Sequence, residues 1–231
     1  NYCLYDQDVS ILEDIITQNN LSVDSPFSLG FQTWFEGRNG YLQVGNTFQG
    51  GNHVLNVLPE TIGNLSNLTI LWLEENNLTE LPESIGDLSS LTNLVLRFNQ
   101  VVSLPESIGN LVNLEELNLY DNQIQDTIPV EIGNLINLKE LYLGRNFIYG
   151  PIPDEIGNLI DLEYLSLKWN DISGSIPSSI ENLINLKLLD LNGNLLSGSI
   201  PEGIVNLVNL ELLYLYSNEL TGEIPSGIGN L

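Results

Sequence analysis

The stretch Leu138–Asp161, LKELYLGRNFIYGPIPDEIGNLID, recurs with small changes along most of this 231-residue chain. In each copy a proline follows Leu or Ile, at spacings of 23 residues twice and then 24 residues five times: Pro59, Pro82, Pro105, Pro129, Pro153, Pro177, Pro201 and Pro225. An asparagine column keeps the same period: Asn76, Asn99, Asn122, Asn146, Asn170, Asn194 and Asn218. A fixed period of this size predicts a solenoid, in which each coil contacts only its neighbours.

One coil combines a short strand with an apolar interior. Leu141 and Leu143 flank Tyr142, and this alternation is typical of a half-buried strand. We expect strands of successive coils to pair in parallel, so that their outward side chains form one continuous face. The inward positions of the coil are predicted to be Leu138, Leu141, Leu143, Ile148, Ile152, Ile156 and Leu159. No single coil buries enough apolar area, and the stacked coils therefore share one long core.

The asparagine column has a structural explanation. Where the chain turns out of each strand, backbone N–H and C=O groups point inward and lose water. A buried Asn side chain has two donors and an acceptor with which to satisfy them. His53, the chain's single histidine, lies 23 residues before Asn76 and continues the column. We interpret the column as a structural ladder rather than a row of ligands.

The proline column predicts short helical or 3₁₀ turns, since proline is tolerated where such a turn begins. Acidic residues just after the prolines favour the positive end of each turn's dipole: Glu60, Glu83, Glu106, Glu131, Asp154, Glu155 and Glu202. Stacking would bring these carboxylates together, and Ca²⁺ bound between coils is the alternative interpretation. Because each coil would supply only about one carboxylate, a Ca²⁺ ion would have few ligands, and we predict no metal and no cofactor.

These residues resemble the leucine-rich repeat family over about residues 45 to 231. The repeats beginning at Leu68 and Leu91 are similar to the 23-residue form, and later ones to the 24-residue plant type with its Gly-x-Ile-Pro signature, as at Gly150–Pro153. The resemblance implies an α/β solenoid. It would be a right-handed superhelix with a parallel β-sheet on its concave side, 3₁₀ or irregular segments on its convex side, and a second short strand near Gly-x-Ile-Pro. Such repeats occur in receptor-kinase ectodomains and in secreted polygalacturonase-inhibitor-like proteins.

Residues 1–44 lack the period and are predicted to form an N-terminal cap. Val9, Leu12, Ile15 and Ile16 recur at helical spacing, which predicts a short amphipathic helix. Residues 45–231 form the predicted solenoid: a degenerate first repeat at 45–67, where Phe48 is in register and Gly45 and Gly50 replace inward leucines, then seven repeats from 68, the last truncated. Plant-type caps usually carry a cysteine pair, whereas Cys3 is the chain's single cysteine.

The charge balance limits the partners. With 30 acidic and 6 basic residues the formal net charge is −24, so nucleic acid and anionic membrane surfaces are excluded as partners. No run reaches the roughly 18 apolar residues that a membrane span needs. The chain contains no methionine, which is consistent with a processed secreted protein. Four N-glycosylation sequons, at Asn20, Asn64, Asn67 and Asn77, fit an extracellular surface.

Projection of the repeats onto the solenoid gathers aromatic and basic side chains on the concave face. The candidate ligand-binding residues are Trp72, Arg97, Phe98, Tyr120, Tyr142, Arg145, Tyr164, Lys168, Trp169, Tyr214 and Tyr216. Trp, Tyr and Arg are the residue types enriched at interface hot spots. The alternative is that strand positions simply favour aromatic residues. Since aromatic and cationic residues share one face, we favour a binding surface.

We predict an extracellular recognition module that binds a peptide, protein or glycan on the concave face, and no enzyme. A Ser–His–acid triad is not supported, since the single histidine lies in the degenerate first repeat. One alternative is a structural protein that stacks head to tail through an uncapped C-terminal end. Binding to ice or a mineral surface is ranked last, because the strand columns are mixed: Trp72, Val95, Asn118, Tyr142, Ser166, Asp190 and Tyr214 share one slot.

Overall fold

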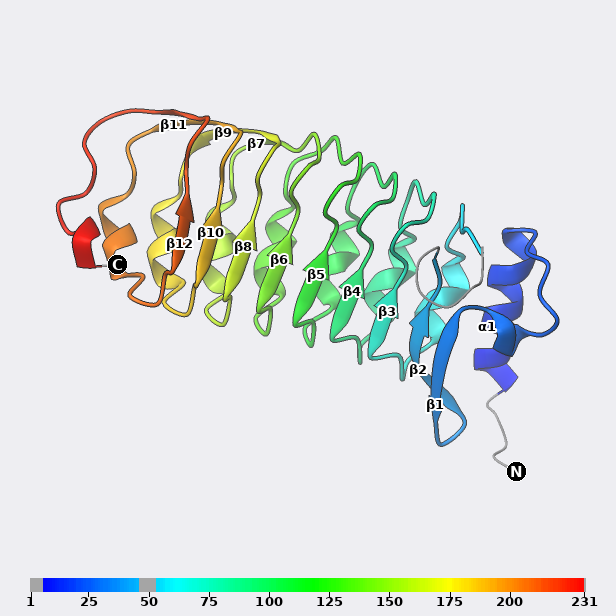
Figure 1. Ribbon diagram of the computed structural model, residues 1–231. Coiled ribbons are helices and arrows are strands. Elements are labelled where there is room, and N and C mark those ends of the chain that lie inside the picture. Colours follow the sequence, from blue (N-terminus) through cyan, green and yellow to red (C-terminus); the bar gives the residue numbers. More distant parts are fainter. Residues whose placement is uncertain (1–5, 46–52, 231) are drawn as a thin grey trace.

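Stacked coils, each with one short strand and one 3₁₀ turn, make up the body of the protein in the computed structural model (Figure 1). The structure describes residues 6–45 and 53–230. Cys3, Phe48 and Gly50, on which part of the sequence interpretation rests, lie outside the described residues. The predicted leucine-rich repeat solenoid is confirmed.

A nine-stranded sheet runs along one side of the stack. Its strands, in spatial order, are β1 (Phe31–Phe35), β2 (Arg38–Gln43), β3 (Ile70–Trp72), β4 (Asn93–Val95), β5 (Glu116–Asn118), β6 (Glu140–Tyr142), β8 (Tyr164–Ser166), β10 (Leu188–Asp190) and β12 (Leu212–Tyr214). From β2 onward all neighbours are parallel and in register, with Leu71 opposite Leu94 and Leu94 opposite Leu117. The repeat period therefore places equivalent side chains in straight columns across the sheet.

A second sheet accompanies the coils that carry Gly-x-Ile-Pro. It consists of β7 (Tyr149–Gly150), β9 (Asp171–Ser175), β11 (Leu195–Gly198) and β13 (Glu219–Leu220), all parallel. Its strands lie along the upper edge of the stack in Figure 1. The signature glycines have φ between 75° and 83° at Gly150, Gly174, Gly198 and Gly222, a left-handed conformation that glycine adopts without strain. The second strand implied by the 24-residue form is therefore present.

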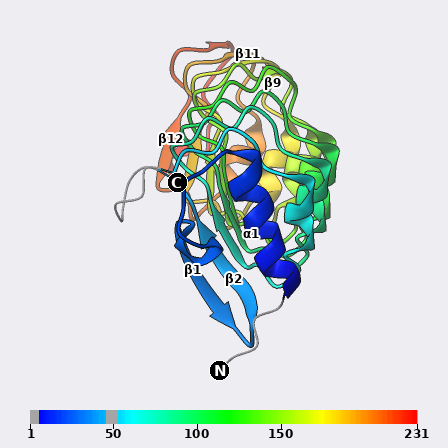
Figure 2. The ribbon, with the colours of Figure 1, turned by 90° about the vertical axis from the view of Figure 1, so that its right-hand side faces the viewer.

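Short 3₁₀ turns follow the proline column, as predicted. They are η2 (Glu60–Asn64), η3 (Glu83–Asp87), η4 (Glu106–Asn110), η5 (Val130–Asn134), η6 (Asp154–Asn158), η7 (Ser178–Asn182), η8 (Glu202–Asn206) and, at the end of the described chain, η9 (Ile228–Asn230). Viewed along the stack, the turns lie on the side away from the main sheet (Figure 2). The Ile-Gly-Asn glycines permit close stacking: a Cβ on Gly133 would lie 2.6 Å from the Cβ of Glu155.

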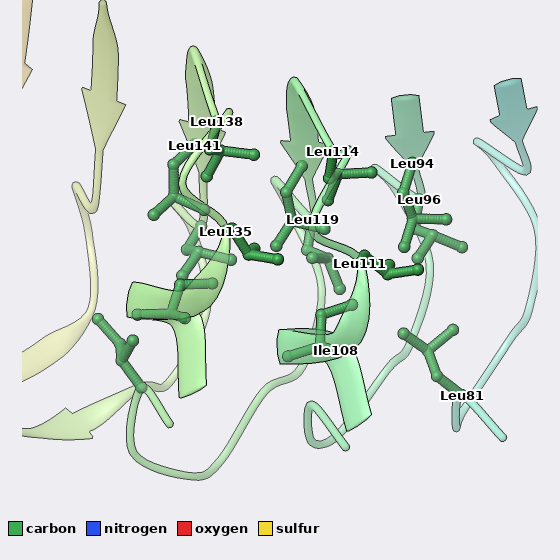
Figure 3. Close-up of a cluster of buried hydrophobic side chains, with 14 of the residues drawn as sticks. Leu81, Leu94, Leu96, Ile108, Leu111, Leu114, Leu119, Leu135, Leu138 and Leu141 are labelled. Atoms are coloured by element: carbon green, nitrogen blue, oxygen red, sulfur yellow. The ribbon is translucent and has the colours of Figure 1, made fainter. Parts of the chain in front are cut away.

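The core fills the space between strands and turns and is continuous from Ile11 to Leu210. Figure 3 shows the pattern in adjacent coils: Leu94 on β4 converges with Leu114 and Leu138, which lie just before β5 and β6, and Ile108 reaches them from a turn. All of these side chains are fully buried. A buried Leu or Ile contributes about 1.5–3 kcal/mol relative to exposure, so stacking supplies most of the stability of each coil.

The asparagine ladder links the coils by hydrogen bonds. Asn146 Oδ1 accepts from the backbone N–H of Ile124 at 3.0 Å, and its Nδ2 donates to the carbonyls of Leu119 at 3.1 Å and Leu143 at 3.0 Å. Asn76, Asn99, Asn122, Asn170, Asn194 and Asn218 repeat this arrangement. Each amide therefore satisfies backbone groups of its own coil and of the preceding one.

The N-terminal segment closes the first coil. The predicted helix is α1 (Asp6–Gln18), which buries Ile11, Leu12 and Ile15 and packs against η2; the turn η1 (Pro26–Ser28) and the β1–β2 hairpin follow. The hairpin's second strand, β2, is also the first strand of the parallel ladder, with Gln43 aligned to Trp72, 29 residues later. The ladder therefore begins before residue 45, inside the segment that the sequence assigns to the cap.

The interpretation of Gly45 was wrong. It lies beside Glu74 rather than at an inward leucine position, and a Cβ there would lie 2.1 Å from the Glu74 carbonyl oxygen. The glycine is required by this close backbone approach.

Candidate binding surface

The outward side of the nine-stranded sheet, here called the concave face, carries all eleven candidate residues, on the strands, just beyond them and in the turn that follows. Trp72, Tyr142, Tyr164 and Tyr214 lie on strands; Arg97, Tyr120, Lys168 and Tyr216 lie just beyond them; and Phe98, Arg145 and Trp169 occupy the turn that follows. None of them is buried, and Trp169 (57% exposed) and Tyr216 (62%) are the most open of the aromatic ones. They remain candidates on geometric grounds.

The turn residues have an unusual backbone. Phe98, Arg145 and Trp169 have φ of 58°, 56° and 57°, in the left-handed region that residues with a Cβ seldom adopt. Each immediately precedes an asparagine of the ladder, whose hydrogen bonds hold the turn in place. At the same position another coil has Gly193, with φ 67°. Glu75, Asp121 and Ser217 have the same conformation at this position of their coils, so it is a property of the scaffold rather than of the candidate residues.

Each cation of the concave face has an acidic neighbour. Arg97 Nε lies 2.5 Å from Glu74 Oε2. Arg145 Nη1 lies 3.4 Å from Asp121 Oδ2, and Lys168 Nζ lies 3.4 Å from Asp190 Oδ2. Sequence reasoning missed these pairs, because the partners come from different coils or from a turn. The face therefore carries ion pairs and rings side by side rather than a positive patch.

The cations also lie over rings in the C-terminal half of the face. The Arg145 guanidinium carbon is 5.6 Å from the centre of the Trp169 ring, and Lys168 Nζ is 5.7 Å from that of Tyr120. Trp169 Nε1 donates a hydrogen bond to Asn192 Oδ1 at 2.7 Å. With Tyr214 and Tyr216 these residues line a cavity of about 290 Å³, here called the C-terminal hollow. It brings together six of the predicted residues, Tyr120 included.

A larger cavity of about 500 Å³, here called the N-terminal hollow, lies at the other end of the concave face, across β1 to β5. Phe31, Tyr41 and Trp72 line one part of it, and Glu74, Arg97 and Glu116 another. Sequence reasoning missed Phe31 and Tyr41, because they precede the region in which the repeat assigns a face to each side chain. Because aromatic and charged side chains line this hollow together, it is a second candidate site.

Glu140 and Tyr142 occupy the sheet between the hollows. Burial raises the pKa of the Glu140 carboxyl above its usual range; a hydrogen bond from the Tyr142 hydroxyl opposes this, and the neighbouring Glu116 and Glu163 add to it. The pKa of Tyr142 is raised as well, by burial and by the neighbouring Glu140. Glu116 and Glu140 are aligned on adjacent strands, where like charges are unfavourable.

A separate column of exposed apolar residues runs along the turns that lead into the strands. Val112, Ile136, Ile160, Ile184 and Val208 occupy one slot in five successive coils and are between 47% and 67% exposed. This column was not predicted from the sequence, because its apolar residues stand beside buried leucines of the repeat and resemble core positions. It gives the molecule a regular apolar edge outside the concave face.

The concave face offers several kinds of group for non-covalent binding. Rings, amides, hydroxyls and paired charges can stack on a ligand, donate and accept hydrogen bonds, and neutralise charge. Within residues 6–45 and 53–230, no three His, Cys, Asp or Glu side chains cluster as a metal site would require. The same ranges contain no helix with the length and apolar composition that crossing a membrane demands.

Three solved structures are among those similar to this chain. The plant peptide hormone receptor RGFR1 in complex with RGF2 is 37% identical with a TM-score of 0.70, over 75% of this chain and 32% of that one. A TDR receptor is 36% identical with a TM-score of 0.73, over 74% and 30%. A leucine-rich repeat protein of Leptospira interrogans is 40% identical with a TM-score of 0.68, over 78% and 44%. This chain thus spans about a third of the receptors' length.

A search of curated proteins gave no match. Family models give a direct assignment. The model described as a leucine-rich repeat region matches residues 41–147, and the single-repeat model, Leucine Rich Repeat, matches residues 137–159, 161–183, 185–207 and 209–231. Together they cover the whole region that carries the proline and asparagine columns. On this match and the coil geometry, the chain belongs to the leucine-rich repeat family.

Proposed function

We propose that this protein is an extracellular recognition module that binds a peptide, protein or glycan on its concave face. The observation that carries the proposal is the gathering of exposed rings, paired cations and two hollows on one face of a rigid sheet. Trp, Tyr and Arg anchors in such settings supply most of the energy of known interfaces. The variation of these residues from coil to coil suits a specific ligand.

The similar structures support a peptide or protein ligand in particular. RGFR1 was solved with RGF2 bound, and another similar structure, 31% identical over 84% of this chain, is the ectodomain of the Arabidopsis thaliana receptor kinase GASSHO1/SCHENGEN3 in complex with CASPARIAN STRIP INTEGRITY FACTOR 2. An extracellular location agrees with these relatives. It also agrees with the exposure of Asn20, Asn64, Asn67 and Asn77, the sequons predicted to be glycosylated.

The test is a screen of the whole chain against an extended-peptide library and a glycan array, followed by one combined variant. Arg145→Ala, Lys168→Ala and Trp169→Ala together should abolish binding of the ligands found while the fold is retained. Lys139→Ala is the matched control, because Lys139 is an exposed cation paired with Glu115 outside both hollows. Ligands whose affinity survives the combined variant would contradict this placement.

A second candidate function is self-association, and the apolar column of Val112, Ile136, Ile160, Ile184 and Val208 favours it. Exposed apolar stripes of this regularity mark contact surfaces. Five side chains about half exposed nevertheless offer much less area than the ~800 Å² per partner of a standard interface. We therefore place side-by-side association of copies below ligand binding.

Light scattering coupled to size exclusion tests this alternative over a hundredfold range of concentration, with Ile160→Asn as the variant. An oligomer that Ile160→Asn dissociates would support the alternative. A monomer at all concentrations would remove it, together with stacking through the C-terminal end.

A further inference from the structure

The N-terminal hollow has a continuous aromatic wall. The Phe31 and Tyr41 rings meet edge to face with centres 5.5 Å apart, and the Tyr41 and Trp72 rings follow at 5.8 Å. The Tyr41 hydroxyl donates to Gln43 Oε1 at 2.9 Å, which fixes the middle ring. Aromatic faces carry partial negative charge and attract cations within about 6 Å. The wall is thus suited to a cationic group with an apolar stem.

The charges around the hollow are unbalanced toward the acidic side. The Glu74 charge is neutralised by Arg97, whose guanidinium is drawn toward the Phe98 ring at 5.6 Å. Glu116 accepts a hydrogen bond from Asn93 Nδ2 at 2.8 Å. Among the described residues neither Glu116 nor the adjacent Glu140 is in an ion pair. Two aligned carboxylates without a cation leave room for one supplied by a ligand.

The lining selects the kind of cation. A hard metal ion needs six or more oxygen ligands, whereas three rings and Val95 form one part of this lining, and of its two carboxylates that of Glu74 already pairs with Arg97. A guanidinium or ammonium on an alkyl stem places its methylenes against the rings and its charge at the carboxylate. The formal net charge of −24 favours approach of a basic ligand from any direction.

The geometry points to the N-terminal hollow as a binding site for a basic side chain, arginine or lysine, of an extended peptide. Phe31, Tyr41 and Trp72 cover the stem, and Glu116, backed by Glu140, neutralises the head group. This inference rests on the proposed function and adds a ligand class to it: a peptide that carries a basic residue toward the N-terminal end of the stack. It assigns binding roles to Phe31, Tyr41, Glu116 and Glu140, which the repeat pattern does not single out.

The probes that test it are N-acetyl-arginine amide and N-acetyl-citrulline amide, which have nearly the same shape but differ in charge. The whole chain, labelled with ¹⁵N at the tryptophan indoles, is titrated with each at physiological salt. Trp72→Phe assigns the Trp72 indole signal among those of Trp34, Trp72 and Trp169. We expect a saturable shift of the Trp72 signal with the arginine probe and binding of the citrulline probe at least about fivefold weaker. Equal responses to both probes, or a response at Trp169 alone, would overturn the inference.

A charge-matched pair of variants separates local binding from general attraction. Glu116→Gln should weaken the arginine probe about fivefold, whereas Glu106→Gln, which removes the same charge from the exposed turn η4, should leave its affinity unchanged. Thermal unfolding verifies that both variants fold. If both substitutions weaken binding equally, or neither does, Glu116 has no specific role and the inference fails. Peptides that depend on Arg145, Lys168 and Trp169 would still bind in that case, so the proposed function is tested separately.

Discussion

The Asp8 carboxylate is completely buried and faces Arg38 thirty residues away. Arg38 Nε lies 3.0 Å from Asp8 Oδ1 and also donates to Oδ2 at 3.0 Å, while the backbone N–H of Asn39 donates to Oδ2 at 2.8 Å. One carboxylate thereby joins α1 to β2, the first strand of the parallel ladder. The attachment of the N-terminal helix to the repeats thus depends on a polar contact as well as on apolar packing.

Asp8→Ala should destabilise the protein by about 3 kcal/mol, because it removes the buried carboxylate that accepts hydrogen bonds from Arg38 Nε and from the buried backbone N–H of Asn39. Urea unfolding, with hydrogen exchange of α1, measures the loss. Asp6→Ala, on the exposed side of the same helical turn, should change stability by no more than about 0.5 kcal/mol. Equal effects of the two substitutions would show that the Asp8 contact adds nothing.

Asn146→Ala should cost about 2 kcal/mol. The substitution leaves the buried N–H of Ile124 without an acceptor, at about 1–3 kcal/mol. The carbonyls of Leu119 and Leu143 lose one of their two amide donors and keep those of Asn122 and Asn170. Asn134→Ala, at an exposed position of η5, is the control and should be nearly neutral. The measurement is the free energy of unfolding in guanidinium for both variants. A small decrease for Asn146→Ala would mean that water takes over the hydrogen bonds of the amide.

Gly133→Ala should lower the stability by about 1–3 kcal/mol, as expected for overpacking. The new methyl group would lie 2.6 Å from the Cβ of Glu155 and force adjacent turns apart. A domain of this size loses about 2–4 °C of melting temperature per kcal/mol. Gly229→Ala is the control, because a Cβ there meets nothing within 4 Å. An unchanged melting temperature for Gly133→Ala would show that the stack expands without cost.

Glu140→Gln should stabilise the protein at pH 7. Burial and the neighbouring carboxylates raise the pKa of Glu140 above its usual range, so the folded state binds its proton more readily than the unfolded state does. The ionised group therefore costs stability at pH values above the folded-state pKa, and that cost disappears as the pH falls below about 4, the ordinary range of glutamate.

Melting temperatures of the Glu140→Gln and unaltered proteins between pH 3 and pH 8 should converge at the acid end. Glu106→Gln controls for the loss of one charge from an acidic protein. A Glu140→Gln advantage that is independent of pH, or equal to that of Glu106→Gln, would contradict this account.

The sequence predicts the fold well because the coil repeats. The spacing of Leu141, Leu143 and Pro153 assigns strand, core and turn in one coil, and repetition extends that assignment to the others. It also places Trp72, Tyr142 and Tyr214 in one column of the concave face. What the period cannot predict is side-chain reach across coils, such as the pairing of Lys168 with Asp190, since this depends on rotamers rather than on register.

The N-terminal hollow was beyond sequence reasoning for a different reason. Phe31 and Tyr41 precede the repeats, and the coil that joins β2 to β3 is longer than the next one, so no register could be carried back to them. The left-handed turn, by contrast, had a readable signal. Gly193 stands immediately before a ladder asparagine, at the position that Phe98, Arg145 and Trp169 occupy in other coils, and a glycine there indicates a positive φ.

The register of the sheet fixes the distance between side chains that lie on different coils. Trp72 on β3 and Trp169 after β8 are separated by four strand steps, or roughly 19 Å at the spacing of neighbouring strands. Because each coil contacts only its neighbours, duplicating or removing one whole coil between them would lengthen or shorten this distance by about 4.8 Å, the length of one to two residues of an extended peptide. The number of coils between the two tryptophans thus sets the length of ligand that contacts both of them.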